Sequence, residues 1–319
     1  MHDAAAGSVT FFTDHYVNAR AAQASDMIAV QLRETGLVTV DGLRSRHHVL
    51  AFASRLMDLT SHPHSAQDGL TLIRDTGSHA YRAGFAGLGN GELQAHTERS
   101  GTPQPPRLML LVCLRPALTG GDVLIADGAH VYGRLLDSCP EAAMKLAQPR
   151  TACYGAGVGY ATQVITAHTE GRISIRLRQD SLARWSPVVR PYLPHLRGAI
   201  ADSQHRIVLQ AGQGYLLDNH RWLHARMPFS GDRRLLRALG EPCFSMPNGF
   251  SPLSSAVLGR PANHDGEEAT VKGAERVEVG TTMFDARHPH RPGHGRPEAE
   301  MKLRPIHGDR ARMCRGQGH

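Results

Sequence analysis

The tripeptide His96-Thr97-Glu98 combines an imidazole and a carboxylate two positions apart. On an extended segment such residues point to the same face, so both side chains can reach one ion. A histidine from a distant strand would complete a triad of two histidines and one carboxylate. That triad leaves three coordination positions open and is typical of non-haem Fe(II) sites. The same tripeptide recurs as His168-Thr169-Glu170, and the chain has 20 histidines, so the pattern alone does not identify the metal site.

The surroundings of the two copies differ. Gly171 and Arg172 follow the second copy, between the strand-like segments QVITAHT and RISIRLR, and predict a hairpin turn. We therefore expect the second copy at an exposed loop tip. The first copy precedes a loop rich in Gly and Pro and then LMLLVCLRPALTGGDVLIADG, which has the pattern of a buried strand, a glycine turn and another strand. This context favours the first copy as the metal site.

A pair of arginines is the second candidate for chemistry. In GYLLDNHRWLHARMPFSGDRRLLRALG, two expected strands flank a Ser-Gly-Asp turn, with His224 in the first strand and Arg233 and Arg237 in the second. Strand parity puts the two arginines on one face. Guanidinium groups on an interior face are costly without anions, and each can bind a carboxylate through two hydrogen bonds. The pair therefore indicates a carboxylate ligand, unless these arginines pair with surface Asp and Glu side chains.

These motifs together resemble the taurine dioxygenase and clavaminate synthase-like family of Fe(II)/2-oxoglutarate oxygenases. The resemblance covers roughly residues 70–242, where HTERSG, RLMLLVCLRP, GGDVLIAD and the arginine-containing segment follow in the family's order. His224 lies 128 residues after His96 and 13 residues before Arg237, and both spacings fit the family. The second tripeptide lies only 56 residues before His224 and lacks the strand pattern that should follow it.

The resemblance implies a role for each matching residue. His96, Glu98 and His224 would hold Fe(II), Arg237 would pair with the distal carboxylate of 2-oxoglutarate, and Arg233 would lie near the other end of this cosubstrate. The reaction implied is hydroxylation of an unactivated C–H bond in a small polar substrate, such as a free or carrier-bound amino acid. In it, 2-oxoglutarate and O2 become succinate and CO2. Desaturation and epoxidation stay open.

Four further positions bear on the ligands. Val123 follows Gly-Gly-Asp, where family members often carry a threonine whose hydroxyl contacts 2-oxoglutarate. Valine cannot donate that hydrogen bond, and its loss costs about 1 kcal/mol. Arg178 and Asp180 resemble positions that contact substrate in some members, although a solvated strand edge explains them equally well. Asp218, just before the strand of His224, could line the pocket, but a turn role is favoured.

Two other classes of protein stay open. A cupin-like metal-dependent isomerase or hydrolase would keep the triad but would not use 2-oxoglutarate, and the two arginines on one face argue against it. A non-catalytic jelly-roll binding protein would need no triad, and the intact triad argues against it.

The elements that must position these residues are mainly strands. Residues 20–35 and 44–60 have helical periodicity, and a series of short strand-like segments follows from residue 70. Helical inserts at 129–147 and around 187–203 interrupt this series. The pattern predicts a mainly β fold with flanking helices, as an antiparallel sandwich or barrel. The family resemblance specifies a double-stranded β-helix, or jelly-roll, core.

Composition bounds the remaining choices. The chain has 319 residues, 41% hydrophobic, 20% charged and 5% aromatic, with a formal net charge of +7. Residues 1–259 should form the oxygenase domain, and 260–319, rich in His, Arg, Pro and Gly, should form a flexible tail. Basic residues are not gathered in runs, which disfavours nucleic acid as a partner. No apolar run is long enough to span a membrane.

The expected partners are therefore a small-molecule substrate and O2, with the oligomeric state open. The five cysteines form no CxxC pair, which disfavours a disulfide framework or a thiolate zinc site. A soluble cytoplasmic protein is the default expectation.

Overall fold

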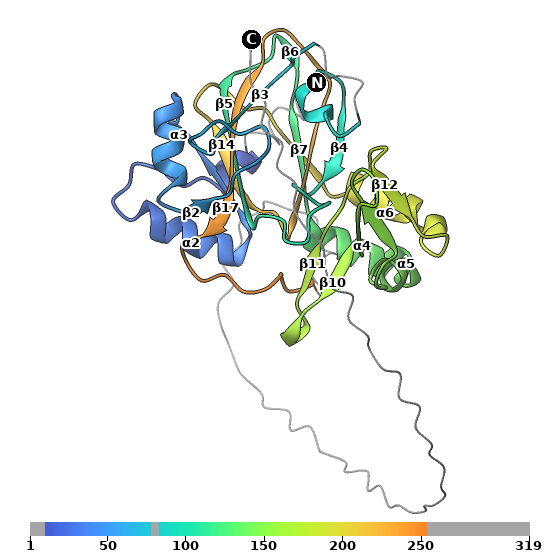
Figure 1. Ribbon diagram of the computed structural model, residues 1–319. Coiled ribbons are helices and arrows are strands. Elements are labelled where there is room, and N and C mark those ends of the chain that lie inside the picture. Colours follow the sequence, from blue (N-terminus) through green and yellow to red (C-terminus); the bar gives the residue numbers. More distant parts are fainter. Residues whose placement is uncertain (1–9, 78–82, 254–319) are drawn as a thin grey trace, which may run out of the picture. The chain divides into compact units, whose positions relative to one another are not determined.

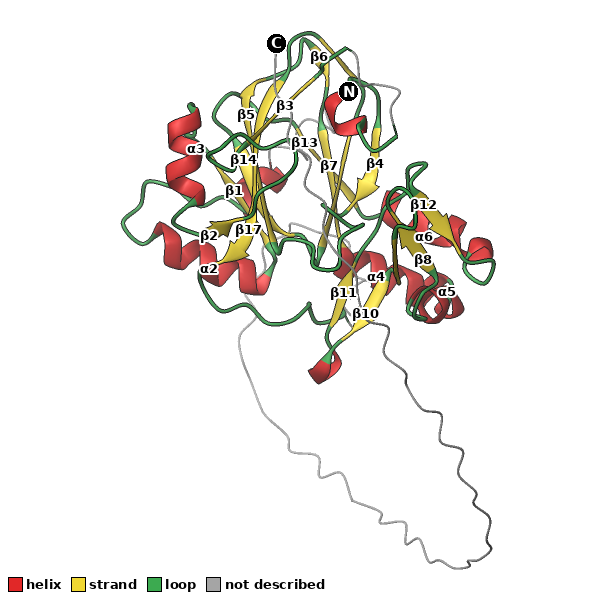
Figure 2. Ribbon diagram, in the orientation of Figure 1, coloured by secondary structure: helices red, strands yellow, loops and turns green. Residues whose placement is uncertain are grey.

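The structure is a computed structural model that describes residues 10–77 and 83–253. Two antiparallel sheets form its centre, and helices flank them (Figures 1 and 2). The larger sheet has strand order β1-β14-β5-β17-β2, with β3 also paired to β17, and the smaller has order β13-β7-β15-β4. The predicted mainly β architecture is confirmed at this level. The predicted tail, 260–319, lies outside the described residues.

The bounds of the elements are as follows. The larger sheet contains β1 (Leu37–Val40), β2 (Met57–Leu59), β3 (Thr71–Arg74), β5 (Leu108–Arg115), β14 (Gly214–Asp218) and β17 (Arg234–Pro242). The smaller sheet contains β4 (Leu93–His96), β7 (Val123–Asp127), β13 (Gln204–Ile207) and β15 (Trp222–Arg226). Three minor sheets pair β12 (Ala183–Trp185) with β8 (Ala152–Tyr154) and β9 (Tyr160–Thr162), β10 (Ile165–Ala167) with β11 (Ile173–Ile175), and β16 (Phe229–Ser230) with β6 (Thr119–Gly120). The α-helices are α2 (Ala24–Glu34), α3 (Arg46–Ala53), α4 (Gly128–Ser138), α5 (Pro140–Leu146) and α6 (Leu193–Ala201), and the 3-10 helices are η1 (Ala86–Leu88), η2 (Thr169–Gly171) and η3 (Arg190–Tyr192).

Side chains along β17 point alternately to the two faces of the larger sheet, so this strand contributes to two apolar layers. Leu236 and Ala238 pack into the apolar core that α2 and α3 cover, whereas Leu235 and Leu239 pack between the two sheets. Arg237 lies on this second face and lines the cavity between the sheets. The prediction that Leu235 and Arg237 share one face and Leu236 lies on the other is therefore confirmed, because successive side chains of a strand point to opposite faces.

The outer face of the smaller sheet is also covered by helices. Ala126, Leu223 and Ala225 pack against an apolar cluster that includes side chains of α4, α5 and α6. Figure 1 shows α2 and α3 outside the larger sheet and α4 to α6 beyond the smaller one. The two sheets are thus held by helices on their outer faces, and the space between them is left for the functional site.

Two predicted helices have different bounds in the structure. The helix expected over 44–60 ends at Ala53, and Met57–Leu59 instead pairs with Gly240–Pro242 of β17. Met57 can be buried either in a longer helix or in a strand, so the pattern of apolar residues could not distinguish the two. The backbone hydrogen bonds that β17 offers favour the strand. The insert expected over 129–147 is two helices, because Pro140 cannot continue the first.

Two further findings concern the described residues alone. None of their helices is both long and apolar enough to cross a membrane. Their four cysteines, Cys113, Cys139, Cys153 and Cys243, are free thiols.

Candidate metal centre

Two paired strands of the smaller sheet, β4 and β15, bring His96, Glu98 and His224 together. His96 ends β4, and the register places it directly opposite His224 of β15, with 4.1 Å between the ring centroids. One potential ligand atom from each of the three side chains lies within 4.8 Å of the other two. Among the described residues this is the one group of three His, Cys, Asp or Glu side chains with such geometry. The structure thus brings the predicted triad together.

Partners from distant segments hold the chain in place on both sides of the carboxylate. The backbone N–H of Glu98 donates to Oδ1 of Asn219 at 2.6 Å, and Nδ2 of Asn219 donates back to the carbonyl oxygen of Glu98 at 3.0 Å. One residue earlier, the N–H of Thr97 donates to the carbonyl oxygen of Leu177, and the Thr97 hydroxyl accepts from the N–H of Leu177. Glu98 is therefore presented by a backbone with little freedom to move.

Burial and neighbouring charges set the protonation of the three groups. Burial lowers the pKa of both His96 and His224, so the imidazoles stay neutral and can coordinate a cation. Burial alone would raise the pKa of Glu98, but the nearby guanidinium of Arg237 lowers it to about 2. Nδ1 of His96 lies 2.8 Å from the carbonyl oxygen of Gln94, which orients the ring and leaves Nε2 available.

This donor set fits divalent iron. Nδ1 of His224 is buried and has no hydrogen-bond partner among the described residues, and Nε2 of the same ring lies 4.0 Å from Oε2 of Glu98. Two neutral imidazoles and one ionised carboxylate are the ligands of the facial triad that binds non-haem Fe(II).

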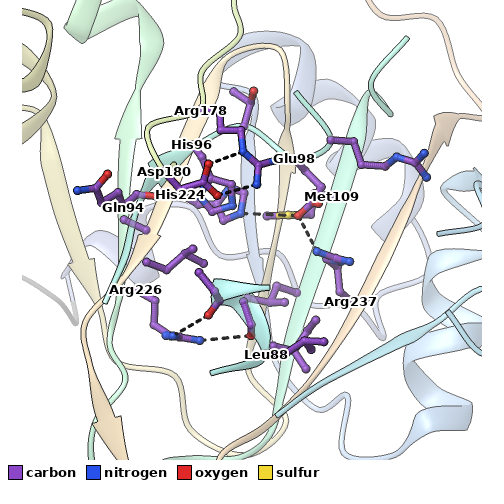
Figure 3. A pocket seen from close by; sticks show the side chains of 18 of the residues that line it. Leu88, Gln94, His96, Glu98, Met109, Arg178, Asp180, His224, Arg226 and Arg237 are labelled. Atoms are coloured by element: carbon purple, nitrogen blue, oxygen red, sulfur yellow. Dashed lines mark hydrogen bonds and ion pairs between the residues drawn. The ribbon is translucent and has the colours of Figure 1, made fainter. Parts of the chain in front are cut away.

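The cluster opens into a cavity of about 590 Å³ between the two sheets (Figure 3). Both sheets supply its walls, because β5, β14 and β17 face β4, β7 and β15 across it. Its lining includes five of the predicted ligand-contacting residues: Val123, Arg178, Asp180, Arg233 and Arg237.

The two arginines occupy different parts of this cavity. Nη1 of Arg237 donates to Oε2 of Glu98 at 2.7 Å, which puts Arg237 at the metal cluster (Figure 3). Arg233 is buried against Gly121, with its guanidinium 5.4 Å from the centre of the Phe229 ring. Within the described residues, no carboxylate forms an ion pair with Arg233. Arg233 precedes β17 and Arg237 lies within it, so the two guanidinium groups reach the cavity from different points of the chain.

The ion pair of Arg237 with Glu98 does not test the expected role of Arg237 at the carboxylate remote from the metal, and that role stays a prediction. Strand parity predicted the shared face correctly. It could not predict which arginine lies nearer the metal, because that depends on how β17 runs relative to β4 and β15.

A family model described as "Taurine catabolism dioxygenase TauD, TfdA family" matches residues 4–239. The chain belongs to this family. Membership confirms the resemblance inferred from the motifs, and the matched range contains all three residues of the metal cluster.

Two curated proteins are similar to this TauD/TfdA family member. It is 26% identical over 167 residues to the gamma-butyrobetaine dioxygenase of Homo sapiens, a match that covers 47% of this chain and 43% of the relative. It is also 26% identical over 147 residues to the uridine-5'-phosphate dioxygenase of an Amycolatopsis species, covering 41% and 54%. The chain therefore spans less than half the length of the first relative and just over half of the second.

Two solved structures share the fold of this family member. An asparagine oxygenase in complex with Fe(II), 2S,3S-3-hydroxyasparagine and succinate aligns with a TM-score of 0.57 at 15% identity, over 74% of this chain and 89% of that one. The non-heme iron oxygenase OrfP, in complex with Fe, succinate and (3S)-hydroxy-L-Arg, aligns with a TM-score of 0.56 at 16% identity, over 69% and 81%.

Of the three residues predicted to contact substrate, Arg178 and Asp180 line the cavity and Asp218 does not. Arg178 and Asp180 form two hydrogen bonds of 2.6 Å with each other and line the cavity beside His96 (Figure 3). Asp218 is buried away from the cavity lining and pairs with Arg107 at 2.7 and 2.8 Å. A substrate contact by Asp218 is therefore not supported, because its side chain is not part of the cavity lining.

Sequence reasoning missed Arg226, which lies two residues after His224 and also lines the cavity. Its guanidinium donates to the carbonyl oxygens of Ala86, Gly87 and Gly91, so it anchors the segment that contains η1 to the cavity wall. Burial lowers the pKa of Arg226 to about 10. Parity with His224 could have identified this residue, because positions i and i+2 of a strand share a face.

Proposed function

We propose that this protein is an Fe(II)- and 2-oxoglutarate-dependent oxygenase that hydroxylates a C–H bond of a small polar substrate. One observation carries the proposal: in a member of the TauD/TfdA family, the His96, Glu98 and His224 cluster opens into a cavity that also contains the buried guanidinium of Arg233. No carboxylate among the described residues pairs with this guanidinium. A metal site and a separate anion site in one cavity fit a cosubstrate that has a chelating end and a charged far end.

His96, Glu98 and His224 are the residues that would hold the metal. Bound Fe(II) supplies the activation of O2 that lets an unactivated C–H bond be hydroxylated while 2-oxoglutarate becomes succinate and CO2. The chain keeps the two imidazoles neutral by burial. Arg237 keeps Glu98 ionised and oriented through the 2.7 Å ion pair.

We assign the distal carboxylate of 2-oxoglutarate to Arg233, in place of Arg237. Arg233 is buried and has no ion-pair partner in the part of the chain that the structure describes, and a planar guanidinium matches the two oxygens of a carboxylate. Val123 follows the Gly121 backbone on which Arg233 packs, so its buried side chain forms an apolar wall at this end of the cavity.

An amino acid is the substrate class we favour. The complexes of the two similar solved structures contain hydroxylated asparagine and hydroxylated arginine. In this chain the ion pair of Arg178 and Asp180 offers one positive and one negative group beside His96, which matches the charges of an amino-acid zwitterion. We therefore propose that these two residues contact the substrate.

We also propose that the two sheets form the double-stranded β-helix of the jelly-roll fold. Successive main strands alternate between the larger and smaller sheets from β3 to β7 and again from β13 to β17. Between β7 and β13 the chain inserts α4, α5 and α6 and returns to the smaller sheet. Such alternation gives eight strands in two facing sheets. The proposed domain is 1–259, with 260–319 as a tail.

An anaerobic visible spectrum tests the proposed function. Fe(II) and then 2-oxoglutarate are added to the wild type, to His224→Ala and to the control His168→Ala. We expect a metal-to-ligand charge-transfer band in the wild type and the control, and none in His224→Ala. If iron binds to the wild type but 2-oxoglutarate produces no band, the protein is a metal enzyme of another kind and the proposal is wrong.

A further inference from the structure

The hydroxyl of Tyr215 is a buried polar group that has no partner within residues 10–77 and 83–253. Tyr215 lies in β14, its side chain is fully buried, and its oxygen accepts or donates no hydrogen bond among the described residues. Buried polar atoms of native proteins nearly always have a partner, so an orphaned one calls for a ligand, ion or water. Tyr215 lines the cavity that contains the metal cluster, so a ligand in this cavity can reach it.

The sheet register shows which way this side chain faces. Tyr215 is paired with Leu111 of β5, and Leu111 is paired with Arg237 of β17. The three residues therefore form one row across the larger sheet and share the face toward the smaller sheet. All three line the cavity, whereas their neighbours Leu110, Leu216 and Leu236 pack under the helices on the other face.

The charged group that acts most strongly on this hydroxyl is Arg233. Its charge affects the pKa of Tyr215 more than the charges of Glu98 and Arg237 do. Burial raises the pKa of Tyr215 well above its ordinary value, so the hydroxyl keeps its proton and can donate. The Tyr215 hydroxyl and the Arg233 guanidinium, which has no carboxylate partner among the described residues, line one cavity. An anionic acceptor is the ligand that suits both groups.

Three of the other side chains that line the cavity, Val123, Thr71 and Thr97, do not provide this donor. Val123 belongs to the same apolar cluster as Tyr215 and has no hydrogen-bonding group. The hydroxyl of Thr71 is engaged with that of Ser65, and the hydroxyl of Thr97 is engaged with the backbone of Leu177.

We propose that the hydroxyl of Tyr215 donates a hydrogen bond to the carboxylate of 2-oxoglutarate that is remote from the metal. Tyr215 and Arg233 together then form the distal-carboxylate site, with Tyr215 as the hydroxyl donor that Val123 cannot be. This assignment rests on the proposed function, because it takes 2-oxoglutarate as the occupant of the cavity.

The test compares two oxo acids that differ at the distal end. Isothermal titration calorimetry of the Mn(II)-loaded protein measures binding of 2-oxoglutarate and of 2-oxobutyrate, which lacks the distal carboxylate. We expect Tyr215→Phe to weaken 2-oxoglutarate binding about ten- to a hundredfold, the effect of one hydrogen bond to a charged group, and to leave 2-oxobutyrate binding unchanged. Arg233→Gln should show the same selectivity with a larger loss.

Tyr154→Phe is the matched control. Tyr154 is also fully buried, but its hydroxyl donates to the carbonyl oxygen of Arg176 and it is not part of the cavity lining. This variant should bind both oxo acids as the wild type does. In the absence of ligand, Tyr215→Phe should melt no lower than the wild type, because the hydroxyl that it removes has no partner there. Its melting temperature should then rise less than that of the wild type when 2-oxoglutarate is added.

The outcomes separate this inference from the function on which it rests. If Tyr215→Phe binds 2-oxoglutarate as tightly as the wild type, or loses affinity equally for both oxo acids, the role of Tyr215 is wrong and the proposed function stands. If the wild-type Mn(II) protein binds no 2-oxoglutarate, both are wrong.

Discussion

The two His-Thr-Glu tripeptides have the same sequence and contrasting environments. His96-Thr97-Glu98 leaves the end of β4 and lines the central cavity. In the second copy, His168 immediately precedes the turn η2 between β10 and β11, and Thr169 and Glu170 lie within it. Glu170 has a φ of 60°, and its side chain is 83% exposed. The hairpin turn predicted for the second copy is confirmed. Identical residues therefore produce a buried cluster at one place and a surface turn at the other.

The difference lies in the origin of their partners. In the second copy, His168 contacts Ser174 only six residues away, and Glu170 lies 4.0 Å from Arg172. The first copy takes its partners from distant segments: Leu177, Asn219, His224 and Arg237. Local sequence supplies the ligand types, and long-range contacts turn one copy into a metal site.

Replacing the histidine should break this contrast most strongly. His96→Ala removes one of three ligand groups, so we expect Mn(II) or Fe(II) affinity to fall at least roughly a hundredfold and turnover to vanish. His168→Ala removes the equivalent residue of the second copy and should keep metal affinity and turnover at wild-type levels. Calorimetric metal titration checks both variants. Equal losses in both would mean that the cluster in the cavity is not the metal site.

Removing the long-range support of the first copy should have a smaller effect. Asn219→Ala leaves the backbone N–H and carbonyl of Glu98 without their side-chain partner, so we expect about tenfold weaker metal binding, as for other groups that orient a ligand. Ser174→Ala removes the contact of His168 and serves as the control, with unchanged affinity. Metal titration and thermal melting are measured together. A lower melting temperature with unchanged metal affinity would show that Asn219 only stabilises the fold.

The threonines should give the smallest difference. Thr97 is buried and its hydroxyl accepts from the N–H of Leu177, so Thr97→Val should lower the free energy of unfolding by about 1–2 kcal/mol. Thr169 is exposed in the turn, and Thr169→Val should change that free energy by no more than about 0.5 kcal/mol. Urea denaturation monitored by circular dichroism checks both. Similar values for the two variants would contradict the importance of burial in this comparison.

The sequence by itself determined the residue types and the local faces. The two-residue spacing of His96 and Glu98 and the four-residue spacing of Arg233 and Arg237 put each pair on one side of an extended chain. The order of these motifs was enough to identify the family and its expected triad. Pro140 also ended a helix, as its missing N–H requires, although the split of the insert was not predicted.

The tertiary structure decided which of these groups work together. It chose one tripeptide, placed Arg237 rather than Arg233 at the metal cluster, and engaged Asp218 with Arg107 away from the cavity. Spacing along the chain determines only the face on which a side chain lies. The direction of a strand relative to its neighbours, and the residues that reach it from far along the chain, depend on how the whole domain packs.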